Sequence, residues 1–291
     1  MEYQLINGKV LRTEEALIPL NDLGLLRGYS VFDYFRVLQG VPVFIEDHVE
    51  RLYQSTARID LDLNWTADEI KQMCHDLVAA NGGPTVNAGM RIVVTGGFAS
   101  DGFTPTDSNI FITLHPLPTY APTDYTAGRG LLSSNYTRSM AEIKTTIYGH
   151  VISLRKKMKE ANAIEALYHS DGLITECSRA NIFFVTKDNR IITPASNLLR
   201  GITRKHVIRL AAEASYPVIE EDIYMADLHE MKEAFISSTT KGVMPIVKVD
   251  DIFIGNGAVG EVSIVLRNAF LKLIDNYIAS HQQNQQVIPE V

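Results

Sequence analysis

A stretch punctuated by prolines, close to the middle of the chain, constrains the fold most. Pro116, Pro118 and Pro122 lie close together there, and the residues around them show no apolar periodicity. Such a stretch interrupts regular structure, and 291 residues exceed the usual size of one domain. The sequence therefore predicts an N-terminal small α/β domain, an interdomain linker and a larger C-terminal α/β domain, at residues 1–116, 117–128 and 129–291.

Both long segments mix strand and helix patterns, which predicts an α/β (α+β) fold class. The clearest helix is Thr66–Ala80, where Thr66 and Glu69 form a capping box ahead of an apolar face. The polar, glycine-rich stretch Gly96–Ser108 is typical of a lid or binding loop. Strands are expected near residues 1–9, 36–44, 91–95, 109–115, 130–135, 165–169, 182–186 and 234–238, and further helices near 47–59, 148–161, 203–215 and 262–280.

Composition and charge narrow the class of protein. With 46% hydrophobic and 21% charged residues, the chain has enough apolar side chains for sizeable cores. A net charge of −7 disfavours a general nucleic-acid binder. No apolar run reaches the roughly 18 residues of a membrane span, and the first ten residues do not resemble a signal peptide. Only two cysteines, Cys74 and Cys177, argue against a disulfide framework, so we expect a cytoplasmic enzyme.

Several familiar site motifs are absent or incomplete. Gly255-Asn-Gly257-Ala-Val-Gly260 spells G-x-G-x-x-G, but the helix after it is the last element, so the βαβ unit of a dinucleotide site cannot form. We interpret it as a turn and a helix start. His229-Glu230 lacks the second histidine of H-E-x-x-H, and no metal site is expected. Cys177 has no pattern of a nucleophile around it and is expected to be buried.

Four other segments together suit one kind of cofactor. Lys144 lies between a strand and a helix, and Glu176 follows an apolar pair. Gly201–Arg204 opens a helix whose first N–H groups can hold an anion, and Ser237–Thr240 places four hydroxyls after a strand. Taken singly, these are more often a surface lysine, a strand-end charge, a cap and a turn. Together they would suit a phosphorylated carbonyl cofactor bound by a lysine.

These segments resemble those of the class IV aminotransferases, the fold type IV enzymes that depend on pyridoxal 5'-phosphate. The run from Glu176 to Asn181-Ile182-Phe183, followed by Leu199-Arg-Gly-Ile-Thr-Arg204, is specific to the group. The resemblance extends over nearly the whole chain. It implies two α/β domains with the cofactor at their interface, and a homodimer in which partner loops complete each pocket. Small-molecule amino acids and 2-oxo acids are the implied substrates, with no nucleic-acid or membrane partner.

The resemblance also assigns roles to residues around the cofactor. Lys144 matches the lysine that forms the Schiff base and moves a proton at the substrate Cα, which requires an amine pKa well below the usual value of about 10.4. Glu176 matches the carboxylate that hydrogen-bonds the pyridine nitrogen. Tyr148 matches a tyrosine near the phenolic oxygen of the cofactor. Arg51, Ile202, Thr203 and Thr239 match the phosphate-binding residues, and Ser238 is expected to assist them.

The substrate is less clearly indicated, because the chain departs from each subgroup. Asp101 and Phe103 occupy the positions of the R-x-H motif that binds the α-carboxylate in bacterial D-amino acid enzymes. Gly89-Met90-Arg91 keeps the arginine of the Y-x-R motif of branched-chain enzymes but lacks its tyrosine. By contrast, the Ser238-Thr239-Thr240 run looks more like that of the D-amino acid group.

Two arginines are candidates for a replacement carboxylate site. Arg27 lies in a loop that the resemblance implies reaches the neighbouring subunit, and Arg91 opens a strand among apolar residues, where a buried charge needs a partner. Either arginine can bind a substrate carboxylate or an internal acid. Phe32 and Thr240 complete the expected substrate contacts.

Three activities remain as alternatives. A D-amino acid aminotransferase with a non-standard carboxylate site is favoured, and two carboxylate-binding arginines favour 2-oxoglutarate and glutamate as one substrate pair. An L-branched-chain aminotransferase and an aminodeoxychorismate lyase are the other two. Enantiomer preference is not determined by the sequence.

Overall fold

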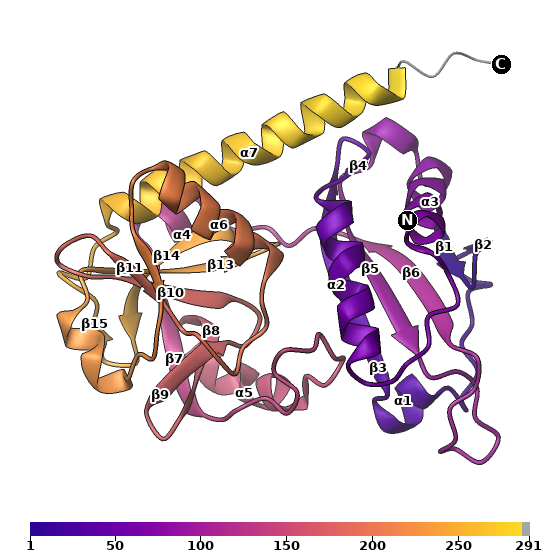
Figure 1. Cartoon of the computed structure of the whole chain (residues 1–291), viewed down its shortest axis with the longest axis horizontal. Coiled ribbons are helices and arrows are strands. Elements are labelled where there is room, and N and C mark those ends of the chain that lie inside the picture. The colour runs from indigo at the N-terminus through magenta and orange to yellow at the C-terminus, as the bar shows by residue number, and fades with distance from the viewer. Residues whose placement is uncertain (287–291) are drawn as a thin grey trace. The chain divides into compact units, whose positions relative to one another are not determined.

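The computed structural model describes residues 1–286 and divides the chain into two compact units (Figure 1). The first unit contains Met1–Pro118, the short segment Ile143–Ile147 and the end of the last helix from Ile274 onward. The second contains Thr119–Glu142 and Tyr148–Leu273. None of the helices within the described residues is long and apolar enough to cross a membrane.

The first unit is built on a six-stranded antiparallel sheet with the order β2-β1-β6-β5-β3-β4. Two tight turns set its hairpins, Asn7-Gly8 and Gln39-Gly40, and both residues of each turn have positive φ. Asn-Gly favours such a turn, because asparagine tolerates the left-handed region and glycine adopts it freely. The strands are β1 (Tyr3–Ile6), β2 (Lys9–Arg12), β3 (Ser30–Leu38), β4 (Val41–Pro42), β5 (Ala88–Thr95) and β6 (Asn109–His115).

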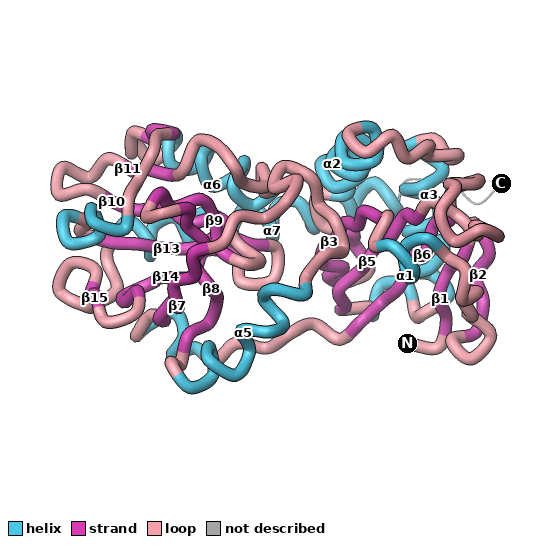
Figure 2. Tube along the Cα trace, turned by 90° about the horizontal axis from the view of Figure 1, so that it is seen from below, coloured by secondary structure: helices cyan, strands magenta, loops and turns pink. Residues whose placement is uncertain are grey.

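Two helices, α2 (Ile45–Ala57) and α3 (Ala67–Ala80), cover one face of this sheet (Figure 2). Alternate residues of β3 and β5, such as Phe35 and Ile92, pack against them in one apolar core. The predicted capping box of α3 is confirmed: Thr66 and Glu69 bond reciprocally at its start. A short helix, α1 (Leu23–Arg27), and a 3-10 turn, η1 (Gly83–Thr85), complete the described elements of this unit.

The second unit contains a nine-stranded mixed sheet. Its main path is β12-β11-β10-β13-β14-β7-β8-β9, and β15 pairs with β14. The pairs β11–β12, β14–β7 and β7–β8 are parallel, and the others are antiparallel. The strands are β7 (Arg129–Asn135), β8 (Ala163–Ser170), β9 (Leu173–Cys177), β10 (Asn181–Val185), β11 (Ile191–Thr193), β12 (Val218–Glu220), β13 (Glu233–Ser238), β14 (Gly242–Val249) and β15 (Ile252–Phe253).

The helices of this part of the chain are α4 (Pro122–Thr126), α5 (Gly149–Glu160), α6 (Ile202–Glu213), the 3-10 helix η2 (Met225–Glu230) and α7 (Glu261–Gln286). The G-x-G-x-x-G stretch is a turn that leads into α7, with positive φ at Gly255 and Gly257. Gly260 lies against the buried side chain of Glu233, whose carboxylate accepts hydrogen bonds from the N–H groups of Val262 and Ser263. The stretch therefore serves the packing and capping of a helix.

The mixed α/β fold class predicted from the sequence is confirmed by the two sheets and their helices. The predicted helices are all present, although α2 begins at Ile45 and α7 extends to Gln286. The strand pattern missed β2, β11, β12 and β14, and β14 contains Pro245. Pro245 pairs with Phe235 of β13, while the pairing of β14 with β7 begins only at Ile246. A proline fits where a ladder is incomplete on one side.

Candidate active site

Lys144 belongs to the first unit, where its segment runs beside β3. The carbonyl of Lys144 accepts a hydrogen bond of 2.8 Å from the N–H of Phe32, and its own N–H points to the Ser55 hydroxyl of α2 at 3.5 Å. Thr146 adds a hydroxyl contact of 2.5 Å to Ser30. The side chain is half-buried, and its Nζ lies 4.3 Å from the centroid of the Phe32 ring. Backbone contacts therefore fix the lysine, and an aromatic face contacts its amine.

Arg51 is held in a buried polar cluster one helical turn from Ser55. Its Nε and Nη2 each donate to the carboxylate of Asp33 at 2.8 Å. The Nδ1 of His48 lies 2.6 Å from the same carboxylate. Burial opposes ionisation of Asp33, but the charges of Arg51 and His48 hold the pKa of its carboxyl well below its usual value. Burial lowers the pKa of His48, although Asp33 opposes that shift. Arg51 is thus a fixed cation whose side-chain geometry is set by Asp33.

Arg91 and Arg27 lie in surroundings that differ from one another. The expectation that Arg91 is a buried charge at a strand start is wrong: it lies inside β5 and its side chain is exposed. Its Cζ is 5.8 Å from the ring centroids of both Phe32 and Tyr34 on β3. Arg27 ends α1, is also exposed, and donates from Nε to the carbonyl of Gly102 at 2.9 Å. The structure therefore brings Lys144, Phe32 and Arg91 together around one aromatic ring.

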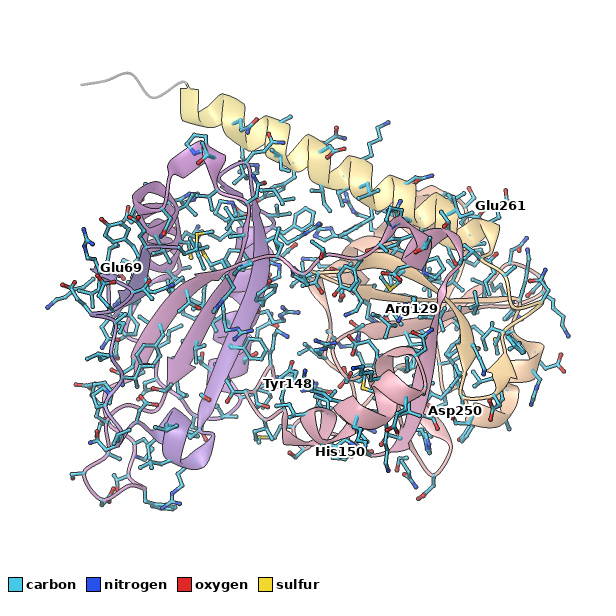
Figure 3. All side chains as sticks on the ribbon, turned by 180° about the vertical axis from the view of Figure 1, so that it is seen from behind. Glu69, Arg129, Tyr148, His150, Asp250 and Glu261 are labelled. Atoms are coloured by element: carbon cyan, nitrogen blue, oxygen red, sulfur yellow. The ribbon has the colours of Figure 1, made fainter. Side chains whose placement is uncertain are left out.

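The second unit holds Glu176 at the end of β9. One carboxylate oxygen accepts a hydrogen bond of 2.7 Å from Nε of Arg138, and the other accepts one of 3.0 Å from the N–H of Leu199. Tyr148 is the residue that precedes α5 (Figure 3). Burial raises the pKa of its phenol, and the charges of Glu176 and Glu165 add to that rise against the opposing charge of Arg138. The carboxylate is nearly fully buried and is oriented by a cation that the sequence patterns did not single out.

The start of α6 has no side-chain cap, and the helix contacts β13. Its first residues, Ile202 and Thr203, are buried. A Cβ on Gly201 would lie 2.3 Å from the side-chain oxygen of Asn181, and Asn181 is the strand partner of Ser237. The Ser237 hydroxyl is buried without a hydrogen-bond partner among the described residues. Uncapped N–H groups and an unsatisfied buried hydroxyl fit a phosphate.

The turn after β13 carries the remaining predicted residues. Ser238, Thr239 and Thr240 are half-buried, and Ser238 accepts a hydrogen bond from the N–H of Lys241. Thr240 accepts one of 3.4 Å from the Tyr120 hydroxyl. Lys241, which the sequence patterns did not identify, forms a buried ion pair of 2.6 Å with Glu165. That pair anchors the turn to β8.

The predicted residues thus fall into one group in each unit. In the first unit, Lys144 and Arg91 contact Phe32 of β3, and Arg51 of α2 binds Asp33 of the same strand. Glu176 and the α6 and β13 termini belong to the second. The residues missed by sequence reasoning are acids and bases that hold a predicted residue in place. Asp33 follows Phe32 on β3, at a position where the strand pattern expects an inward-facing apolar residue. A carboxylate at such a position is a signal in the sequence, but by itself it does not indicate a chemical role.

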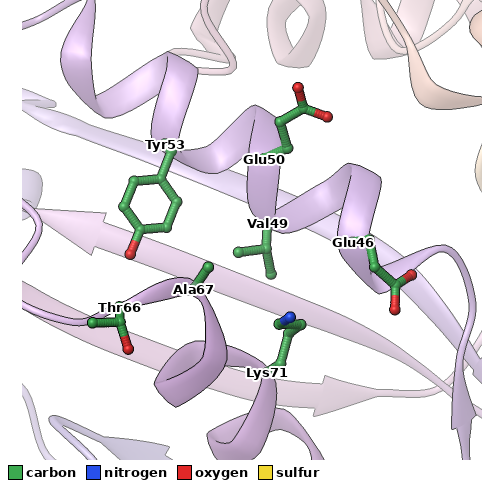
Figure 4. A pocket seen from close by; sticks show the side chains of 7 residues that line it. All are labelled: Glu46, Val49, Glu50, Tyr53, Thr66, Ala67 and Lys71. Atoms are coloured by element: carbon green, nitrogen blue, oxygen red, sulfur yellow. The ribbon is translucent and has the colours of Figure 1, made fainter.

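A separate groove lies between α2 and α3 (Figure 4). It has a volume of about 560 Å³ and is lined in part by Glu46, Glu50 and Lys71. No predicted site residue lines it. Apolar side chains such as Val49 and Ala67 also line this surface groove, which is distinct from the residues described above.

Comparison with known proteins identifies the family of the chain. The family model for amino-transferase class IV matches residues 30–249. The D-alanine aminotransferase of Bacillus licheniformis is 31% identical, with 92% of this chain and 96% of the relative covered. That of Listeria monocytogenes is 29% identical over 93% and 95%. The crystal structure of the branched-chain amino acid aminotransferase of Escherichia coli superposes with a TM-score of 0.86 at 26% identity, covering 94% of each chain.

The chain belongs to the class IV aminotransferases. It is an enzyme that transfers amino groups between amino acids and 2-oxo acids, and enzymes of this class use pyridoxal 5'-phosphate. The predicted family, activity and cofactor are therefore confirmed.

Proposed function

We propose that the chain is a D-amino acid aminotransferase that uses glutamate and 2-oxoglutarate as one of its substrate pairs. Two relatives named D-alanine aminotransferase match more than nine-tenths of the chain at 29% and 31% identity, which supports the D-amino acid assignment. The acidic pair is supported by Arg91, an exposed cation that contacts the same Phe32 ring as the Lys144 amine. That shared ring is the observation that supports the acidic pair, because the Arg91 guanidinium and the Lys144 amine contact the same side chain.

In this proposal Lys144 does the proton chemistry. When bound, pyridoxal phosphate supplies an electron sink for the charge that develops at the substrate Cα. Lys144 would hold the cofactor through its Nζ. Once the amino group of the substrate has displaced that Nζ, the free amine would take the Cα proton, so it must be neutral for that step. The segment around Lys144 is fixed by its backbone bonds to β3, which holds the Nζ in reach of one carbon atom.

The remaining proposed residues bind and orient the cofactor. Glu176 would accept a hydrogen bond from the protonated pyridine nitrogen, and Arg138 keeps the carboxylate in place. Arg51, Ile202, Thr203, Ser238 and Thr239 bind the phosphate, and Tyr148 donates to the phenolic oxygen. Arg27, Phe32, Arg91 and Thr240 contact the substrate. Fixed dipoles and charges of this kind need no reorganisation during the reaction.

We further propose a cytoplasmic homodimer. The segment around Arg27 exposes Leu25 and Leu26, and Phe103 on the neighbouring loop is 76% exposed. A second copy of the chain would cover these apolar side chains. Both cysteines are free and buried, as in a reducing compartment. Light scattering coupled to size exclusion tests the dimer, and a monomer at micromolar concentration would contradict it.

One second function has specific support. An L-branched-chain aminotransferase agrees with the structural likeness to the Escherichia coli enzyme of that name. Single half-reactions of the holoenzyme with D-alanine, D-glutamate, L-leucine and L-glutamate separate the two, with the absorbance of the bound cofactor as the signal. We expect the D-enantiomers to react faster. Faster reaction of L-leucine and L-glutamate would establish the second function.

A further inference from the structure

Tyr34 and Gly89 fit one another on the face of the six-stranded sheet opposite the α2–α3 core. Tyr34 alternates along β3 with core residues such as Phe35, and Gly89 lies on the neighbouring strand β5. A Cβ built on Gly89 would lie 1.7 Å from the Tyr34 hydroxyl oxygen and 2.4 Å from Cζ. Any side chain at position 89 would therefore displace the phenol.

The backbone gives no other reason for glycine at this position. Gly89 is not among the residues with positive φ, and as the second residue of β5 it pairs with Arg36 of β3 and His115 of β6. Glycine in a strand interior weakens the strand and often marks a close approach by another group. Here the approaching group is the Tyr34 phenol. The pair Tyr34 and Gly89 thus fixes where one hydroxyl lies.

That hydroxyl is carried by the direct cross-strand neighbour of Arg91. Tyr34 pairs with Arg91 in the β3–β5 register, and its ring leans along the strand to the diagonal position, Gly89. The Arg91 Cζ is 5.8 Å from the ring centroids of both Tyr34 and Phe32. On its other side Arg91 pairs with Thr113 of β6. The two aromatic rings therefore flank an exposed guanidinium, within the range of cation–π contact.

Phe32 connects this face to the reacting amine. Its ring lies 4.3 Å from Lys144 Nζ and 5.8 Å from Arg91 Cζ, so both cationic groups contact one side chain. A molecule that reacts at Lys144 and extends along Phe32 meets Arg91 and the Tyr34 side chain next.

We propose that Tyr34, held in its position by Gly89, is a specificity-determining residue that binds a substrate carboxylate together with Arg91. The inference rests on the proposed function, because it concerns the same site. The phenol O–H and the guanidinium N–H groups are both donors, and one carboxylate accepts from both. The two rings exclude water from one side of that carboxylate.

The first test removes only the hydroxyl. In the holoenzyme, Tyr34→Phe should weaken binding of glutarate, measured by calorimetry, by roughly tenfold or more, as expected for one hydrogen bond to a charged group. Cofactor content and thermal stability report on folding, and Tyr224→Phe, an exposed tyrosine of the second unit, is the matched control. Unchanged glutarate affinity in Tyr34→Phe would overturn the proposal.

Kinetics with two acceptors identify the carboxylate. If the pair holds the distal carboxylate, Tyr34→Phe lowers kcat/KM for 2-oxoglutarate relative to pyruvate by roughly tenfold. If it holds the carboxylate next to the reacting carbon, both values fall together, mainly through KM. A change in neither KM would contradict carboxylate binding by Tyr34.

A second variant tests the role of Gly89. Gly89→Ala should weaken glutarate binding as much as Tyr34→Phe does, because the added methyl displaces the phenol. In a Tyr34→Ala background the same change should cost little more, a non-additivity that marks direct coupling. Gly130→Ala is the matched strand control, since a Cβ there meets atoms only at 3.9 Å or more. If the losses of glutarate affinity in the two single variants were additive, Gly89 would not position the Tyr34 phenol.

These outcomes do not depend on which enantiomer reacts. Glutarate has no amino group and no chiral centre, so its affinity tests only the carboxylate-binding pair. A preference for L-amino acids would contradict the proposed D-amino acid function and leave this inference standing. Unchanged glutarate affinity would contradict the inference and leave the D-amino acid function standing.

Discussion

At the scale of single residues, buried ion pairs orient the side chains that are proposed to contact the cofactor. Asp33 fixes Arg51 through two hydrogen bonds of 2.8 Å, and Arg138 fixes Glu176 through one of 2.7 Å. A buried carboxylate that is paired in this way costs little to keep charged, whereas removing its partner leaves an uncompensated charge. The proposed cofactor contacts are therefore rigid before any ligand binds, which reduces the reorganisation needed in the reaction.

Replacing Lys144 tests the proposed chemical role of one residue. Lys144→Ala should lower single-turnover transamination by roughly 100- to 10,000-fold, the range for loss of a general acid–base group. The exposed Lys156 on α5, replaced by alanine, serves as the control and should react like the parent enzyme. Transamination at the parental rate in Lys144→Ala would refute the assignment.

His48 makes stability depend on pH in a defined direction. Its pKa in the folded chain is lowered by burial, so below its ordinary value of about 6.5 the unfolded chain binds a proton that the folded chain resists. The contribution of neutral His48 to the free energy of unfolding should therefore be complete above about pH 6.5. The free energy of unfolding should fall as the pH drops below that value. His75 and His115 are shifted in the same direction and add to this slope.

Urea unfolding between pH 5 and 8 measures that slope. The substitution His48→Asn keeps a donor near the Asp33 carboxylate but cannot titrate, so the loss of stability on acidification should be smaller than in the parent protein. A comparison at pH 8 separates the packing defect of the substitution from the titration. An unchanged slope would show that His48 does not contribute.

At the scale of elements, two helix N-termini in the second unit differ in whether a side chain caps them. The start of α7 is satisfied by the buried carboxylate of Glu233, whereas the start of α6 has no side-chain cap. Free N–H groups at a helix start attract anions through their hydrogen bonds and the helix dipole. The contrast separates a helix start that stabilises the fold from one that is available to a phosphate.

The capping of α7 predicts a stability effect. Glu233→Gln leaves one of its N–H donors without an acceptor and should reduce the free energy of unfolding by about 1–3 kcal/mol. Glu261→Gln, an exposed change in the first turn of the same helix, should cost less than about 1 kcal/mol. Equal losses in urea unfolding would contradict a specific capping role for Glu233.

The open start of α6 predicts a cofactor effect. Gly201→Ala places a Cβ within 2.3 Å of the Asn181 side-chain oxygen, so the first turn must shift. We expect the affinity for pyridoxal phosphate, titrated into the apoenzyme, to fall by roughly tenfold, in line with one lost hydrogen bond to a charged group. Gly149→Ala at the start of α5, where a Cβ meets nothing within 4 Å, is the control. Parental affinity in Gly201→Ala would argue against this phosphate site.

At the scale of the whole molecule, motifs predicted chemistry better than strand patterns predicted topology. Thr66 and Glu69 predicted the start of α3, because a capping box is a local signal. Asn7-Gly8 predicted a turn for the same reason. The order of the nine-stranded sheet depends on pairings between distant segments, which no local pattern encodes. The strand β14 was missed because Pro245 disfavours a strand until its single-sided pairing is known.

The sequence patterns indicated the residues proposed to contact the cofactor directly, but not the residues that orient them. Lys144 and Glu176 lie in motifs that carry the family resemblance. Arg138 and Asp33 were missed. In a sequence, an arginine or a carboxylate that orients another side chain cannot be told apart from one that does not. For Arg91, burial was expected, but its side chain is exposed and lies near the rings of Phe32 and Tyr34.

The chirality of the product tests the central claim most directly. The holoenzyme is supplied with 2-oxoglutarate and racemic alanine, and the glutamate formed is separated by chiral chromatography. The proposed function predicts D-glutamate, with consumption of D-alanine and retention of L-alanine. Formation of L-glutamate would contradict the D-amino acid assignment and favour the branched-chain type of enzyme.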